Sequence, residues 1–239
     1  MDRVLKITNR SEFLRYLDSV SKINDSAIFE IKPEGISCLV SSADSTLVLF
    51  SEYALASEFT TTINVPDIKK LFRVVETINE DVVNLNINGN NIEYKGKGIK
   101  FKYHLFEEGF LSKPNLNLDK IRSFKLDITF EVARNTIQQL LKGSTFASET
   151  NKVYLYTEDG ELKAELTDRA RHNTDNFAIT IGKADYSLKP IPVNFDNIRL
   201  LSNVNDTYCF NINTDYGVVV IDNCSDHTKL KYIISSLTQ

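Results

Sequence analysis

Four segments of the chain place apolar side chains at intervals of three and four residues, the spacing of an amphipathic helix. They are 9–23, 66–78, 131–144 and 193–204. In the second segment the apolar side consists of Ile68, Leu71, Phe72 and Val75, and the opposite side of Lys69, Lys70 and Arg73. Pro66 favours a helix start there, because an N–H group in the first turn has no intrahelical partner.

The other three segments are expected to bury a comparable stripe. Their predicted core residues are Phe13, Leu14, Leu17 and Val20, then Ala133, Ile137, Leu140 and Leu141, and finally Phe195, Ile198 and Leu201. Arg15, Lys22 and Lys142 fall away from these stripes, and Arg199 lies beside the last one. The pattern therefore predicts helices with one apolar side and one partly cationic side.

Most of the remaining chain alternates apolar and polar residues or is rich in β-branched and aromatic ones, which indicates strands. The predicted strands are 3–8, 26–31, 45–53, 58–65, 82–88, 152–158, 161–168, 176–182, 207–213 and 216–222. Turns that contain Gly join several of them into hairpins. These turns lie at Gly35, Gly89, Gly160 and Gly217.

The four glycines also indicate an internal repeat, since their successive spacings are 54, 71 and 57 residues. The long middle interval contains 107–123, a segment of 17 residues without clear periodicity, and removing it leaves 54. The sequence therefore predicts an α+β protein of four strand–helix–strand–strand–strand units. Two units form an N-terminal domain, 1–106, and two form a C-terminal domain, 124–239, with 107–123 as the connector.

Composition changes this picture little. Hydrophobic residues make up 42% and charged residues 25%, values typical of a globular protein, and neither a membrane span nor a secretory signal is indicated. Cys38, Cys209 and Cys224 are odd in number and form no CxxC pair, which favours reduced thiols in a cytosol-like compartment. A net charge of −4 argues against a nucleic-acid partner, but binding depends on local charge.

No segment carries a recognisable catalytic motif. His104 and His172 lie apart from any nucleophile motif, and the stretch GSTFAS at 143–148 lacks the Lys of a phosphate-binding loop. Potential metal ligands occur together only at Asp222, Cys224, Asp226 and His227, and a polar loop between two strands accounts for them more simply. The sequence therefore favours a binding protein that needs no metal.

Three stretches resemble DNA sliding clamps of the proliferating cell nuclear antigen family. GISCLVSSADSTLVLF at 35–50 is similar to a family hairpin with a Ser-rich turn between apolar strands. The segment 131–168 resembles the start of the second domain in clamps of T-even-type phages, through its QQLL helix, alternating strand and Gly turn. HTKLKYIISSL at 227–237 resembles the family's last strand, and the short connector is also closer to the phage members.

The resemblance implies a DNA-clamp fold whose homotrimeric ring encircles duplex DNA, with helices lining the hole and sheets outside. It implies a polymerase processivity factor that is not an enzyme and has no cofactor. The helical segments should then be more positive than the rest, and 10–22, 66–78, 131–142 and 195–203 sum to +3, which leaves −7 elsewhere. The residues expected to face DNA are Arg15, Lys22, Lys69, Lys70, Arg73, Arg134, Lys142 and Arg199.

The resemblance also implies protein contacts. The ring would close between 98–106 of one subunit and 175–183 of the next, through Lys100, Phe101, Tyr103, Phe177, Ile179 and Ile181. DNA polymerase, a clamp-loader ATPase and further transcription or repair proteins would dock an apolar tail beside the connector. The matching positions are Val40, Leu47, Ile233 and Ile234, which can equally be core strand residues. The expected location is the cytoplasm, that of the host if a phage encodes the chain.

Two other interpretations stay open. One is a non-enzymatic, β-rich phage structural or adaptor protein that does not encircle DNA and whose basic helices are merely solvated. The other is an enzyme whose site assembles from dispersed residues such as Asp222, Asp226 and His227.

Overall fold

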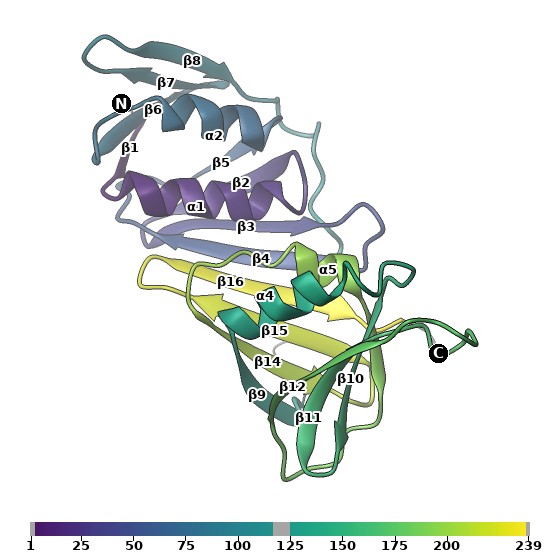
Figure 1. Cartoon of the computed structure of the whole chain (residues 1–239). Helices are drawn as coiled ribbons and strands as arrows, with labels where there is room; N and C mark the ends of the chain where they lie inside the picture. Colours follow the sequence, from purple (N-terminus) through teal and green to yellow (C-terminus); the bar gives the residue numbers. More distant parts are fainter. Residues whose placement is uncertain (1–2, 117–124, 238–239) are drawn as a thin grey trace. The chain divides into compact units, whose positions relative to one another are not determined.

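The computed structural model describes residues 3–116 and 125–237, and its elements follow one another as four βαβββ repeats (Figure 1). The first repeat consists of β1 (Arg3–Ile7), α1 (Arg10–Ser21), β2 (Ala27–Lys32), β3 (Gly35–Ser41) and β4 (Leu47–Ala54). The second consists of β5 (Thr61–Val65), α2 (Ile68–Glu76), β6 (Val83–Asn88), β7 (Asn91–Lys95) and β8 (Lys100–His104).

The remaining two repeats follow the connector. The third consists of β9 (Ile128–Ala133), α4 (Arg134–Gly143), β10 (Lys152–Glu158), β11 (Glu161–Leu166) and β12 (Phe177–Lys183). The fourth consists of β13 (Ile191–Asn194), α5 (Phe195–Arg199), β14 (Thr207–Asn213), β15 (Val218–Cys224) and β16 (Thr228–Ser235). This order confirms the predicted repeat. Among the described helices, none has the length and apolar character needed to cross a membrane.

The marker glycines lie at the turn between the second and third strands of each repeat. Gly160 has a φ of +77°, in the left-handed region that residues with a Cβ atom rarely adopt. At Gly35 an added Cβ atom would lie 2.4 Å from the carbonyl oxygen of Tyr53. The spacing of the glycines therefore reflects the repeat, because the backbone at these hairpin turns favours a residue without a Cβ atom.

The chain divides into two compact units. The first comprises Met1–Leu116 with Cys224–Lys231, and the second comprises Asn117–Asn223 with Tyr232–Gln239. The strand β16 thus begins in one unit and ends in the other. Of the predicted connector, 117–123 lie outside the described residues.

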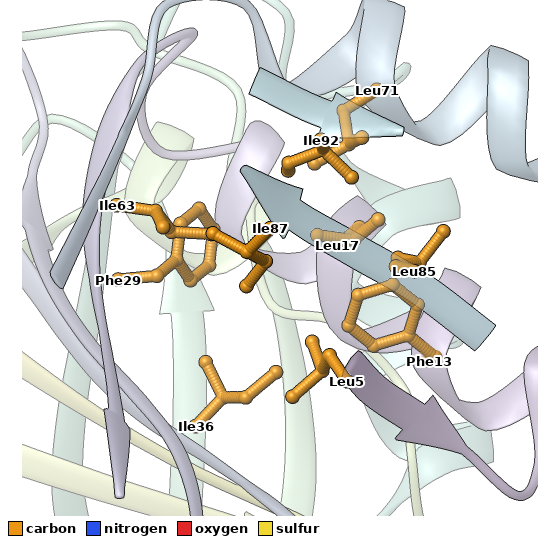
Figure 2. A pocket seen from close by; sticks show the side chains of 10 residues that line it. All are labelled: Leu5, Phe13, Leu17, Phe29, Ile36, Ile63, Leu71, Leu85, Ile87 and Ile92. Carbon is orange, nitrogen blue, oxygen red and sulfur yellow. The ribbon is translucent and has the colours of Figure 1, made fainter. Parts of the chain in front are cut away.

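The first unit contains a sheet of order β1-β6-β7-β8, and strands β5-β2-β3-β4 with the start of β16 beside β4. Helices α1 and α2 pack side by side (Figure 1). Figure 2 shows side chains from both sheets and both helices converging on the core: Leu5, Phe13, Leu17, Phe29, Ile36, Ile63, Leu71, Leu85, Ile87 and Ile92. Burying one such side chain contributes about 1.5–3 kcal/mol, so the core fixes which side of each helix meets solvent.

The predicted stripe of α1 is confirmed at Phe13, Leu17 and Val20 but is wrong at Leu14, which is only half-buried. Tyr16, which is fully buried, completes the stripe instead. Its ring lies 5.6 Å from that of Tyr53 on β4, so the aromatic face of the helix meets an aromatic residue of the sheet.

Both helices of this unit begin at a side-chain cap. The Asn9 side chain accepts a hydrogen bond from the Glu12 N–H (3.1 Å), and Asp67 accepts one from the Lys70 N–H (2.8 Å). The Tyr103 hydroxyl on β8 accepts from the Asp67 N–H (3.0 Å) and donates to the Asp67 carbonyl (2.7 Å). These two bonds fasten the edge strand β8 to the start of α2.

The second unit contains a sheet of order β12-β11-β10-β13, and strands β15-β14-β9 beside the end of β16. Its core lies between these strands and the helices, and is lined by Val132, Ile137, Leu140, Val153, Leu155, Ala164, Ile198 and Phe210. The predicted helix 131–144 begins three residues late, because 131–133 belong to β9. Ala133, predicted to be buried, is exposed and pairs with Thr207 of β14.

The fourth predicted helix, 193–204, is also shorter than expected. Val193 and Asn194 end the strand β13, and the Asn194 side chain caps α5 by accepting from the Asp196 N–H (3.0 Å). The helix ends at Arg199 after five residues. Phe195 and Ile198 are buried as predicted, so even this short helix keeps its apolar side.

Helix α4 meets β12 at Gly143. A Cβ atom at this position would lie 2.2 Å from the ring of Phe177, the first residue of β12. The absence of a side chain at Gly143 thus lets an aromatic ring rest against the end of the helix. This contact positions the beginning of an edge strand.

We expect Tyr103→Phe to lower the free energy of unfolding by about 1–2 kcal/mol, because the Asp67 N–H loses its acceptor. Urea denaturation measures the change. The matched control is Tyr186→Phe, since the Tyr186 hydroxyl is buried without a hydrogen-bond partner in the described part of the chain. Equal losses in the two variants would contradict the assigned role.

Tyr103 should also make the free energy of unfolding depend on pH. Burial raises the pKa of Tyr103 from 10.0 to about 12. A raised folded-state pKa means that the stability it contributes is complete below pH 10 and is lost as the pH rises toward 12. The decline in stability across this window should be smaller in Tyr103→Phe than in the unmodified protein.

We expect Gly143→Ala to lower the free energy of unfolding by about 1–3 kcal/mol, because the new methyl group displaces the Phe177 ring. Helix propensity alone would give a gain of up to about 1 kcal/mol, so the sign of the change is diagnostic. Gly182→Ala on β12 is the control, since its Cβ atom would meet no atom within 4 Å. A stabilised Gly143→Ala variant would disprove the packing argument.

Candidate nucleic-acid interface

The solvent side of the helices in the first unit carries five of the predicted DNA-facing residues. They are Arg15 and Lys22 on and just after α1, and Lys69, Lys70 and Arg73 on α2, and all five are exposed. Their position follows from the apolar stripes, because burying one side of a helix forces the opposite side outward. Since α1 and α2 are neighbours, the charges of both helices occur on one surface of the unit.

Three of these cations have acidic neighbours. Arg15 pairs with Glu12 (2.9 Å), Lys22 with Asp18 (3.0 Å) and Lys69 with Asp25 (2.8 Å). Ion pairs on an exposed surface contribute about 0–1 kcal/mol, so they hold the side chains weakly. A phosphate group can therefore replace a carboxylate at small cost.

Lys70 and Arg73 differ from these three. Within the described residues, no acidic side chain lies within 4.0 Å of either cation. Neither charge is neutralised locally, so both are available to an anionic ligand.

Arg10 was counted among the helix cations from the sequence, but the structure shows that it is engaged within the protein. Its side chain is half-buried and donates a hydrogen bond from Nη1 to the carbonyl of Glu76, the last residue of α2 (2.9 Å). A cation at a helix C-terminus is favourable, so this contact ties the start of α1 to the end of α2. No local sequence signal could reveal it, because the two residues are 66 positions apart.

The second unit presents the other three predicted cations, Arg134, Lys142 and Arg199, and all are exposed. Arg134 lies 3.5 Å from Asp206, and Arg199 pairs with Asp196 (2.9 Å) while stacking over the Phe195 ring (4.7 Å). Lys142 has no acidic side chain within 4.0 Å among the described residues. Each unit therefore has helices with at least one unpaired cation.

Two outer strands, β8 and β12, are the predicted contacts between subunits. Among the strands that the structure describes, β8 pairs with β7 alone and β12 with β11 alone. Their other edges present backbone N–H and C=O groups, which readily pair with another strand. Lys100, Lys102 and His104 on β8 are exposed, as are Ala178 and Thr180 on β12.

Most side chains predicted for this interface are engaged within their own unit. Tyr103 is buried against Asp67, and Phe101 is half-buried and stacks on Tyr94 at 5.6 Å. Ile179 and Ile181 line the core beneath α4, and of the six predicted residues Lys100 alone is exposed. Phe177 is half-buried at Gly143. The groups of β8 and β12 that remain accessible are therefore the backbone edge of each strand and its exposed side chains.

The four predicted partner-binding residues, Val40, Leu47, Ile233 and Ile234, are all buried. Val40 borders a pocket of ≈ 240 Å³ between β2, β3 and 111–114. Lys113 of this segment forms an ion pair with Glu30 on β2, and its ammonium lowers the pKa of that carboxyl. The pocket is thus bordered on one side by the first part of the predicted connector.

Two of the residues considered as metal ligands or catalytic groups contact neighbouring side chains instead. The Asp222 carboxylate accepts a hydrogen bond from Asn211 (3.2 Å), and the His227 ring lies 6.4 Å from that of Tyr53. In the described part of the chain no three His, Cys, Asp or Glu side chains are placed to hold a metal ion. Burial raises the pKa of the Cys38 thiol, which disfavours its thiolate.

Comparison with known proteins shows the fold but not a close relative. No protein-family model matches the sequence, and no curated protein matches it. The solved structures include proliferating cell nuclear antigen of A. fulgidus bound to the C-terminal region of FEN-1, with a TM-score of 0.75 and 11% identity over 100% of this chain and 98% of that one. The antigen from Entamoeba histolytica gives a TM-score of 0.76 and 11% identity over 99% of both chains.

The similarity spans both units and all four repeats. Together with the strand order, it confirms that the chain has the fold of the proliferating cell nuclear antigen sliding clamps.

Proposed function

We propose that the protein is a DNA sliding clamp, a homotrimeric ring that encircles duplex DNA and tethers a polymerase. The observation that carries the proposal is the separation of charge by element on a clamp fold. The helices α1, α2, α4 and α5 contain eight cationic and four anionic side chains, a net charge of +4. The whole chain has a formal charge of −4, so the rest carries −8.

The physical task of a clamp explains why these contacts are weak. Lys and Arg contacts to phosphate give attraction that does not depend on base sequence, because they release counterions from the duplex. Partial neutralisation of Arg15, Lys22 and Lys69 by nearby carboxylates limits that attraction. A ring that retains DNA by enclosure needs no strong contact, and weak contacts allow it to slide.

The ring closes by pairing β8 of one subunit with β12 of the next. Within each chain, β4 and the start of β16, the last strands of the first and fourth repeats, already lie side by side. The last strands of the second and third repeats, β8 and β12, have open edges. Joining them between subunits repeats the internal pairing, and a head-to-tail contact of this kind can close into a ring.

Partner proteins would insert an apolar tail into the pocket beside Val40. The other apolar lining residues are Ala27, Ile28, Leu39, Leu111 and Pro114. The proposed partners are a DNA polymerase and a clamp-loader ATPase, since the clamp itself is proposed to have no enzyme activity. The similarity of 131–168 to phage clamps supports a phage-type member of this group.

We expect removal of the unpaired helix cations to weaken retention on DNA. The variant Lys70→Gln, Arg73→Gln and Lys142→Gln should leave nicked circular DNA at least tenfold faster at moderate salt, while its oligomeric mass is unchanged. The control is Lys6→Gln, Lys95→Gln and Lys189→Gln, which removes the same charge from exposed lysines outside the helices. Equal effects in both variants would show that only net charge matters.

Ring closure gives a second expectation, which light scattering can check. The unmodified protein should have three times the chain mass of 27.2 kDa. Ala178→Lys with Thr180→Lys should reduce this mass, because the new charges meet Lys100 and Lys102 across the paired edges. Ala178→Glu with Thr180→Glu should keep it, and adding Lys100→Glu with Lys102→Glu should restore the lysine variant. If the lysine and glutamate variants had the same oligomeric mass, the proposed pairing of β8 with β12 would be excluded.

A further inference from the structure

An exposed aromatic residue lies at the end of α4 among cationic side chains. Phe146 follows the helix by three residues and has 61% of its surface exposed. Within the described residues, no aromatic ring or cation stacks on it. Large apolar side chains exposed singly are common on protein surfaces, so the groups around this ring decide what it can bind.

The helices that flank the turn of Phe146 supply two cations, Lys142 and Arg199. Lys142 lies one helical turn before it and has no acidic side chain within 4.0 Å in the described part of the chain. Arg199 of α5 reaches the same turn, where its Nη2 donates to the Ser144 hydroxyl (3.4 Å). Two acids belong to the same region: Asp196 pairs with Arg199 and accepts from Asn151 (2.7 Å), and Glu149, three residues after Phe146, is exposed.

The backbone that carries the ring is held in place. The Phe146 N–H donates to the Gly143 carbonyl (3.0 Å), and the Thr145 N–H donates to the Lys142 carbonyl (3.1 Å). Ala147, the next residue, is buried and donates to Gly143 as well (3.2 Å). The aromatic ring is therefore presented by a hydrogen-bonded turn with one buried neighbour, and a ligand would not have to order a loose loop.

We propose that Phe146, Lys142 and Arg199 form a binding site for an unpaired base and its flanking phosphates in single-stranded DNA. An exposed ring gives a base a stacking surface, while the two cations contact phosphate. Paired bases of a duplex are covered on both faces by their neighbours and cannot use the ring in this way. The site therefore adds a preference for single strands to a surface that otherwise attracts any DNA.

This inference goes beyond the proposed function, because it concerns single-stranded rather than enclosed duplex DNA. It would let the protein hold an unpaired strand where a duplex ends. A second copy of the chain covering Phe146 is the competing explanation. The cations favour DNA, since two positive charges beside an apolar ring match a phosphodiester and a base together.

The chain lacks Trp, so Phe146→Trp creates a single fluorescent reporter. We expect oligo-dT of about fifteen nucleotides to quench this Trp and to bind at least fivefold more tightly than a blunt duplex of equal length. Phe146→Ala should lower oligo-dT affinity at least fivefold in a binding assay that does not need the reporter. Neither result depends on ring closure, and duplex retention should remain, so failure here is distinct from failure of the clamp proposal.

Phe110→Trp is the matched control. Phe110 is similarly exposed, at 70%, but follows Glu107 and Glu108, so oligo-dT should leave its fluorescence unchanged. Three results would overturn the proposal: no quenching of Trp at 146, equal quenching by duplex and oligo-dT, or a change that depends on protein concentration without DNA. The last of these would assign the ring to a contact between copies of the chain.

Discussion

The packing of one amphipathic helix against the strands of each repeat is the constraint on which the rest of this structure depends. In α2 the burial of Ile68, Leu71 and Val75 leaves Lys70 and Arg73 no direction but outward. The same interaction that stabilises the fold thereby sets the position of its charges. A cation on such a helix needs no dedicated support, since losing its position would require exposing the apolar stripe.

Strand edges impose the second constraint. Every βαβββ repeat ends with a strand that needs a neighbour, and backbone groups at an open edge invite pairing with another chain. The structure places Lys100 and Lys102 along the outer edge of β8 but leaves Ala178 and Thr180 on β12 without charge. Although Lys102 pairs with Glu93 (3.3 Å), two copies of this edge would still bring lysines together, whereas a basic edge and a neutral one would not. This asymmetry supports the head-to-tail assembly proposed above over a symmetric dimer.

Periodicity and turn glycines predicted the four repeats because both are local consequences of the fold. The limits were equally physical. Of Glu131, Val132 and Ala133 only Val132 is buried, and this pattern fits both a strand and the first turn of a helix. The three residues form a strand because they pair with β14, which the local sequence does not reveal. All eight predicted cations are exposed, but the sequence could not show that Arg10 is engaged at Glu76. Burial of Val40 and Leu47 likewise follows from sheet packing rather than from their own pattern.

An identity of 11% with structures of the same fold is consistent with what these constraints require. They demand apolar side chains at fixed intervals, Gly at a few turns and cations opposite the buried stripes, but almost no particular residue. A clamp of the kind proposed above would read no base sequence and carry out no catalysis, so few of its positions would require one particular side chain. The proposed DNA-facing cations could therefore occupy different helical positions in different clamps while the surface stays positive. For such a protein, the distribution of charge over the elements is a better guide to function than any single motif.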